Sequence, residues 1–348
     1  MLQPARRIAL AAVAVLALSA CEVDDDPDAT DEPTELEDPA ATDDEPAPTE
    51  EPDPLPDDLE DSEEPDVAED PAPPVASGGF GVLAGATDAS VEEAATAVED
   101  AIAGGPAEPA FDVDHAQQAA EAGLELLDTR LLVFGDPEVG TPLMQQEPLM
   151  GLDLPAKVLI WEAEDGRTLL GVNDPVFLAQ RHGVDPGSDP LVALDQAQRN
   201  LLDAAGATGV PARLDPGNVA PGIEVRDSDA GFDETLERAR DAVEGAGVEL
   251  VAEIDHAEAA QGVGMDLPDS TLLVFGNPEI GTQLMGLHRT VGIDLPQKLL
   301  VYDDDGQTRV AYNEPVYLRS RHLLAGLEEP LADIGDALDE LAGAATGG

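Results

Sequence analysis

Cysteine is almost absent from this chain of 348 residues, because Cys21 is the only one. A single cysteine excludes an intrachain disulfide and a zinc site built from several thiolates. It also leaves no thiol nucleophile in the long stretch that follows residue 21. Any catalytic or metal chemistry in that stretch therefore depends on other side chains.

Basic residues are also scarce: 16 lysines and arginines oppose 75 acidic residues, which gives a formal net charge of −59. This excess argues against nucleic-acid binding, because such proteins hold phosphates with clustered lysines and arginines. An acidic surface repels itself unless salt screens it, and the screening length falls to about 3 Å at 1 M salt. The composition therefore predicts a halophilic source and a melting temperature that rises with salt.

Residues 1–20 have the layout of an export signal peptide, with two arginines followed by an apolar run at residues 8–18. The run is shorter than the roughly 20 residues that a membrane-spanning helix needs. Residues 18–21 read LSAC and resemble the lipobox of a bacterial lipoprotein. The resemblance implies cleavage before Cys21, lipidation of that cysteine, and a cell-membrane anchor on the extracytoplasmic side. An ordinary secretory peptide with a chance cysteine is the alternative.

Residues 21–78 are rich in Asp, Glu, Pro, Thr and Ala and nearly free of large apolar side chains. Such a segment cannot bury enough surface to offset the entropy of ordering, so we expect it to be disordered. Charge repulsion and proline stiffness extend it, which suits a tether between the anchor and the folded part. Binding of calcium or of a basic partner is the alternative interpretation.

The rest of the chain is a tandem repeat. The sequence LLVFGDPEVGT at Leu131–Thr141 returns as LLVFGNPEIGT at Leu272–Thr282. Matching blocks occur in the same order throughout both halves, which indicates a duplication. We therefore expect two domains, at residues 79–206 and 222–348, joined by a linker at 207–221 that is rich in Gly, Pro and Ala.

The hydrophobic pattern of each copy predicts an α+β fold with helices packed on a mostly antiparallel sheet. Asp114 and Asp136 are suited to cap the helices that follow them, and Gly183 is suited to end one. Four successive apolar residues at 131–134 indicate a strand covered on both faces. The two sheets could pair into one pseudo-symmetric unit. The other strands expected in the first copy lie at 80–83, 111–113, 157–161 and 168–172, and the helices at 89–103, 115–124, 174–181 and 190–205.

Both copies share four sequence blocks in the same order. The blocks are Asp-His-Ala (114–116 and 255–257), the repeated LLVFG stretch, Gly-x-Asp-Leu-Pro-x-Lys (151–157 and 292–298) and a closing Arg-His (181–182 and 321–322). Together they resemble the family called domain of unknown function 302. The resemblance implies a small α+β domain, found alone or in tandem, and no established reaction. The copies differ most between the second and third blocks, so a ligand contact from that loop could differ between them.

Four histidines occupy matching positions in the copies, His115 and His182 in the first and His256 and His322 in the second. Imidazole is a common metal ligand and the usual acid or base near neutral pH. Two histidines with a methionine, Met144 or Met285, would suit copper or haem iron. No closely spaced histidine pair occurs, so the alternative is that each histidine caps a helix or fills a polar niche. The sequence therefore leaves the cofactor unknown.

Lys157 and Lys298 are the only lysines, and they also occupy matching positions. A lysine can hold a carboxylate or phosphate, and a buried one can act as a nucleophile. The alternative is a charge on an edge strand that discourages sheet pairing, or a plain surface ion pair.

These features predict a membrane-anchored extracytoplasmic lipoprotein whose repeated domains bind a small ligand or a metal. A structural module that binds another cell-envelope protein is the alternative. An enzyme that uses histidine as base and lysine as clamp would need both side chains in one polar pocket. The chain has no Gly-x-Ser-x-Gly elbow, phosphate loop or His-Glu-x-x-His motif to support that third interpretation. The candidate ligand contacts are His115, Met144, Lys157 and His182, with His256, Met285, Lys298 and His322 in the second copy.

Overall fold

The computed structural model describes residues 79–211 and 221–348. The expected signal peptide, the lipidation site Cys21, the acidic tether and most of the linker lie outside these described residues. None of the described helices combines the length and the apolar character that crossing a bilayer requires.

The first copy folds into one antiparallel five-stranded sheet with the strand order β1-β5-β4-β3-β2. Its strands are β1 (Val82–Thr87), β2 (Glu108–Asp114), β3 (Thr129–Gly135), β4 (Ala156–Glu162) and β5 (Thr168–Asn173). Its helices are α1 (Val91–Ala103), α2 (His115–Glu121), α3 (Pro137–Gln146), the 3-10 helix η1 (Pro148–Leu152), α4 (Pro175–His182) and α5 (Asp189–Ala204).

The second copy repeats this plan in the strand order β6-β10-β9-β8-β7, so the predicted α+β fold with antiparallel sheets is confirmed. Its strands are β6 (Ile223–Asp227), β7 (Glu249–Asp255), β8 (Ser270–Gly276), β9 (Gln297–Asp304) and β10 (Gln307–Asn313). Its helices are α6 (Phe232–Ala246), α7 (His256–Gly262), α8 (Pro278–Leu287), the 3-10 helix η2 (Arg289–Ile293), α9 (Pro315–His322) and α10 (Glu328–Thr346).

Local sequence signals fix most of the helix ends. The side chains of Asp114 and Asp136 accept hydrogen bonds from the backbone of α2 and α3, as predicted. Gly183 ends α4 in the left-handed conformation, with φ 70°. Helix α1 starts two residues later than expected, because Ser90 forms a capping box with Glu93.

Two further predicted boundaries were wrong for identifiable reasons. The first strand begins at Val82 rather than Phe80, because Gly81 has a φ of 66° and turns the chain. Helix α2 ends at Glu121 rather than at residue 124, because Gly123 lies in the left-handed region. Strand β4 pairs with β3 on one side and with β5 on the other, so it is not an edge strand.

The position of β4 also corrects one interpretation of the lysines. Lys157 on β4 and Lys298 on β9 are each only 4% exposed. They are therefore neither edge-strand charges nor members of a surface ion pair. Alternation along β4 puts Lys157 on the same sheet face as Leu159 and Trp161.

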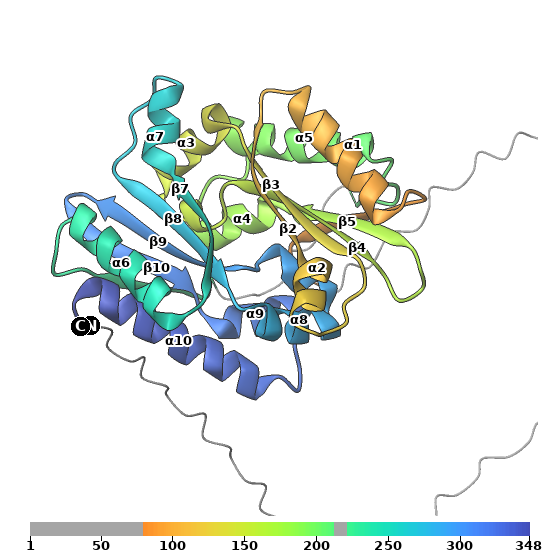
Figure 1. The fold of residues 1–348 in the computed structure, drawn as a ribbon. Helices are drawn as coiled ribbons and strands as arrows, with labels where there is room; N and C mark the ends of the chain where they lie inside the picture. Colours follow the sequence, from red (N-terminus) through yellow and green to blue (C-terminus); the bar gives the residue numbers. More distant parts are fainter. Residues whose placement is uncertain (1–78, 212–220) are drawn as a thin grey trace, which may run out of the picture. The chain divides into compact units, whose positions relative to one another are not determined.

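Each sheet is covered on its two faces by different parts of the chain. Helices α1 and α5 lie on one face of the first sheet, and α6 and α10 lie on the equivalent face of the second (Figure 1). The opposite faces contact the 3-10 helix of the other copy. Ile293 of η2 packs against Leu159 and Trp161, while Leu152 of η1 packs against Leu300 and Tyr302. Each copy thus contributes residues to the core of the other.

Candidate functional site

The repeated polar residues gather first in a buried network around Asp153, the residue that follows η1. Arg181 Nη1 donates to Asp153 Oδ2 at 2.6 Å, and His182 Nε2 lies 2.7 Å from the same oxygen. Lys157 Nζ donates to the main-chain carbonyl of Asp153 at 2.6 Å. All four residues are buried, so the Asp153 carboxylate holds Arg181 and His182, and its main-chain carbonyl holds Lys157, away from water.

The second copy repeats this network around Asp294. Arg321 Nη1 donates to both carboxylate oxygens at 3.0 and 2.9 Å, and His322 Nε2 lies 2.7 Å from Oδ2. Lys298 Nζ donates to the Asp294 carbonyl at 2.7 Å. The two networks therefore have the same members and nearly the same distances.

The histidines of the two networks differ in one contact. His322 Nδ1 lies 3.0 Å from the hydroxyl of Thr290, a residue of η2. The matching residue of η1 is Leu149, which has no polar side-chain atom. His182 Nδ1 consequently has no hydrogen-bond partner within the described part of the chain.

The two arginines connect the networks across the copies. Arg181 Nη2 donates to Asn313 Oδ1 at 2.5 Å, and Arg321 Nη2 donates to Asn173 Oδ1 at 2.6 Å. The Arg181 guanidinium also lies 3.9 Å from the ring centroid of Tyr317. These reciprocal contacts place buried cations at the junction between the copies.

Burial and neighbouring charge decide the ionisation of the network. Burial opposes ionisation of Asp153, but the Arg181 guanidinium and the His182 hydrogen bond hold its pKa well below the usual range. Burial, with Lys298 nearby, lowers the pKa of Lys157 to about 7. A neutral lysine amine is a nucleophile, yet Lys157 lines none of the three pockets found among the described residues.

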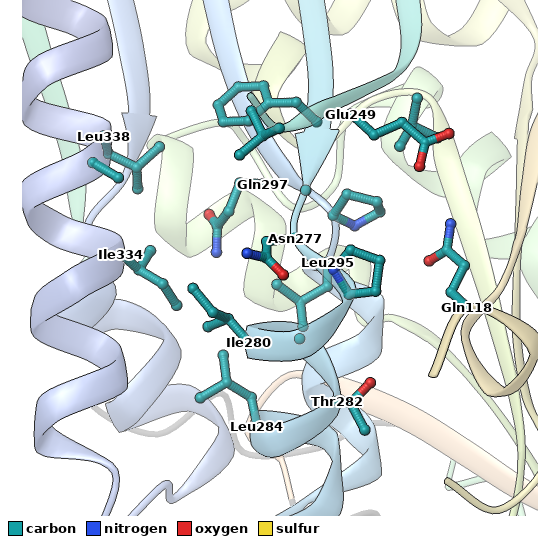
Figure 2. Close-up of a pocket in the computed structure, with 18 of the residues that line it drawn as sticks. Gln118, Glu249, Asn277, Ile280, Thr282, Leu284, Leu295, Gln297, Ile334 and Leu338 are labelled. Carbon is teal, nitrogen blue, oxygen red and sulfur yellow. The ribbon is translucent and has the colours of Figure 1, made fainter. Parts of the chain in front are cut away.

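Two of these pockets are related by the duplication. The first pocket has a volume of about 530 Å³ and lies among the end of β3, the start of α3, and α5. The second pocket has a volume of about 120 Å³ and lies among the equivalent β8, α8 and α10 (Figure 2). Both are lined mainly by apolar side chains. The third, a hollow of about 660 Å³, is mostly polar, with walls from α2 and the start of α8.

Each of the paired pockets is completed by a histidine from the other copy. His256, the first residue of α7, lines the first pocket together with Met144. His115, the first residue of α2, lines the second pocket together with Met285. His256 Nε2 lies 3.2 Å from the carbonyl of Gly151, and burial lowers the pKa of each histidine to about 4. Both imidazoles are therefore neutral at neutral pH.

The eight candidate residues thus divide into two groups. Lys157, His182, Lys298 and His322 belong to the buried networks, whereas His115, Met144, His256 and Met285 line the paired pockets. In each pocket, the histidine of one copy and the methionine of the other copy line the same cavity. Within residues 79–211 and 221–348, no group of three or more His, Cys, Asp or Glu side chains could hold a metal ion.

The difference in pocket volume follows from the side chains at seven matched positions. At each of them the second pocket has the larger residue, so less space remains. The pairs, with the first pocket's residue given first, are Gly105 and Ala246, Ala107 and Val248, Ala110 and Val251, Val139 and Ile280, Ala156 and Gln297, Ala193 and Asp333, and Ala259 and Gln118.

Several residues of the two sites were not identified from the sequence. Asp153, Asn173 and Arg181 hold the network together, and Thr141 lines the first pocket. A signal for them was present, because each recurs at the matching position of the second copy. A charged residue kept twice within an otherwise apolar block, as in Gly-x-Asp-Leu-Pro, indicates a buried partner.

Comparison with known families and proteins identifies relatives of both copies. The model of the family Domain of unknown function DUF302 matches residues 84–205 and 224–343. Over 80 residues, 23% of the chain, the protein is 52% identical to the fluoride-specific ion channel FluC 1 of Brucella suis and to that of Brucella abortus. The match covers 32% and 30% of those proteins, so the chain spans about a third of the length of these relatives.

One solved structure is similar to part of the chain. It is the crystal structure of an uncharacterized conserved DUF302 protein from Bacillus stearothermophilus. The sequences are 26% identical, and the TM-score is 0.34. The match covers 36% of this chain and 98% of that one.

Proposed function

The chain belongs to the family Domain of unknown function DUF302, and on that premise we propose that it binds small, largely apolar molecules in the pockets between its two copies. The observation that carries this proposal is that the same pocket is built twice, each time with a wall from the other copy. Both pockets are lined mainly by apolar side chains and by a buried histidine of the other copy.

The size and lining of the first pocket support this proposal. Pockets for small molecules have volumes of roughly 300 to 1,000 Å³ and mainly apolar walls with a few polar groups. The first pocket, at about 530 Å³, lies in that range. Its apolar walls include Ile102, Met144 and Leu154, and its polar groups include Thr141 and His256. A neutral imidazole can accept or donate a hydrogen bond without the cost of burying a charge.

We also propose that this binding module works outside the cytoplasmic membrane. The LSAC sequence at residues 18–21 and the acidic segment after it support a lipid anchor and a tether. Radiolabelled palmitate fed to expressing cells should enter the wild-type protein but not a Cys21→Ser variant. Equal labelling of both proteins would contradict the anchor and leave the binding proposal unaffected.

Calorimetric titration of the full chain with octan-1-ol, in molar salt, tests the binding proposal. An Ala197→Trp variant places a large ring in the first pocket from α5, because Ala197 lines it. Val192→Trp is the matched control, since Val192 is on the same helix but is 55% exposed and lines none of the pockets. We expect saturable binding to the wild type and the control, and at least tenfold weaker binding to Ala197→Trp. No saturable binding, or equal binding to all three proteins, would overturn the proposal.

A further inference from the structure

The paired pockets differ in whether space for a ligand is left. Gln297 occupies the position of Ala156 at the start of the matching strand, and its amide points into the second pocket near that of Asn277 (Figure 2). Larger residues at the six other matched positions narrow the same pocket further. The remaining volume of about 120 Å³ contrasts with about 530 Å³ in the first pocket. The side chains that line the second pocket thus occupy the space that a ligand would fill.

Each pocket contains a buried polar atom that lacks a hydrogen-bond partner among the described residues, the Thr141 hydroxyl in the first and Gln297 Nε2 in the second. Thr141 is 1% exposed, and its hydroxyl makes no hydrogen bond with any described residue. A buried hydroxyl is normally hydrogen-bonded, because burial without a partner costs free energy. A ligand with one hydroxyl or carbonyl group could supply that partner while its apolar part lies against Ile102 and Leu154.

The charges around the pocket select against an ionic ligand. Glu108 and Asp136 line it, and the whole chain has a net charge of −59, so an anionic head group meets repulsion. A cationic head group would have to be desolvated in apolar surroundings. A neutral head group avoids both costs.

We infer that only the first pocket takes a ligand, and that its ligand is a neutral, mainly apolar molecule with one hydrogen-bonding group near Thr141. This inference rests on the proposed binding function and adds the number of sites and the chemical class. The second copy then acts as a wall, providing His256 and Ala259 to the pocket of the first.

Equilibrium dialysis of the full chain with isotope-labelled octan-1-ol tests the number of sites. We expect one molecule bound per wild-type chain, loss of binding in Ala156→Gln, and no loss in the reciprocal variant Gln297→Ala. Two molecules per wild-type chain, or loss of binding only in Gln297→Ala, would overturn the assignment. Absence of any binding to the wild type would instead overturn the proposed function itself.

A comparison of ligands with different head groups provides a second test. This test does not depend on substitutions in strands β4 and β9. Octanoate and octylammonium have the same chain as octan-1-ol with opposite charges, and we expect each to bind at least tenfold more weakly. Thr141→Val, which keeps the shape of the side chain, should weaken octan-1-ol binding about tenfold and leave octane binding unchanged. Preferred binding of either ion, or an unchanged affinity for octan-1-ol in Thr141→Val, would overturn the chemical class.

Discussion

The duplicated chain has kept its buried networks nearly identical, while its paired pockets have diverged. Asp153 and Asp294 each hold an arginine and a histidine with distances that agree within a few tenths of an ångström. The pockets lie between equivalent helices and strands, yet their volumes are about 530 and about 120 Å³. The two parts of the molecule therefore respond differently to substitution.

Buried charge explains this difference. Removal of one member of a buried ion pair leaves the other without compensation, so members of the network cannot be replaced singly without a large cost. Replacement of Ala156 by glutamine in a pocket wall removes empty space and needs little rearrangement. After a duplication, we expect the networks to keep the copies joined while a pocket can be filled without loss of the fold.

The largest effect should come from Asp153→Ala, which leaves Arg181 and His182 buried without their carboxylate. We expect a loss of about 3 to 5 kcal/mol in the free energy of unfolding, the usual cost of breaking a buried pair. Urea unfolding in molar salt measures it. Asp195→Ala is the control, because its pair with Arg199 is partly exposed and should contribute at most about 1 kcal/mol. Similar losses of unfolding free energy in the two variants would mean that the buried network contributes no more to stability than a surface ion pair.

Lys157 should make the free energy of unfolding depend on pH in the alkaline range. The pKa of Lys157 is about 7 in the folded protein, below the ordinary value of 10.5, so between these values the unfolded chain binds more protons. The free energy of unfolding must therefore rise with pH over this window, by up to about 1.4 kcal/mol per pH unit from this lysine. Urea unfolding at several pH values should show a smaller slope for Lys157→Met. An unchanged slope would mean that Lys157 titrates normally.

Much of this fold was predictable from the sequence, because local signals decide it. Four apolar residues at 131–134 predicted a strand covered on both faces, and all four are buried. The 3-10 helix Pro148–Leu152 was missed, since five residues are too few to show a helical period. The meeting of His115 with Met285 depends on how the copies pack, which no spacing within one copy encodes. The sequence therefore indicated these residues as candidates. It did not indicate which of them belong to the buried networks and which line the pockets.

The pocket histidines should make the protein sensitive to mild acid. Burial lowers the pKa of His115 and His256 from 6.5 to about 4, so between these values the unfolded chain binds more protons. Stability is then lost as the pH falls from 6.5 to 4, by about 3 kcal/mol for each histidine. A double variant, His115→Gln with His256→Gln, should lose less stability over this range in urea unfolding. The carboxylates of the networks do not obscure the result, because their contribution is lost only below the ordinary aspartate pKa of 3.8.

The smallest effect concerns the histidine contact that the networks do not share. Thr290→Val removes the hydroxyl that partners His322 Nδ1 and makes the second network resemble the first, where Leu149 takes that place. We expect a loss of about 1 kcal/mol, the net contribution of a typical hydrogen bond, in urea unfolding at neutral pH. Leu149→Val is the control, because it changes an apolar contact without affecting a polar partner. A loss above about 3 kcal/mol would mean that the second network depends on Thr290 as strongly as on its charges, and that the networks have diverged as well as the pockets.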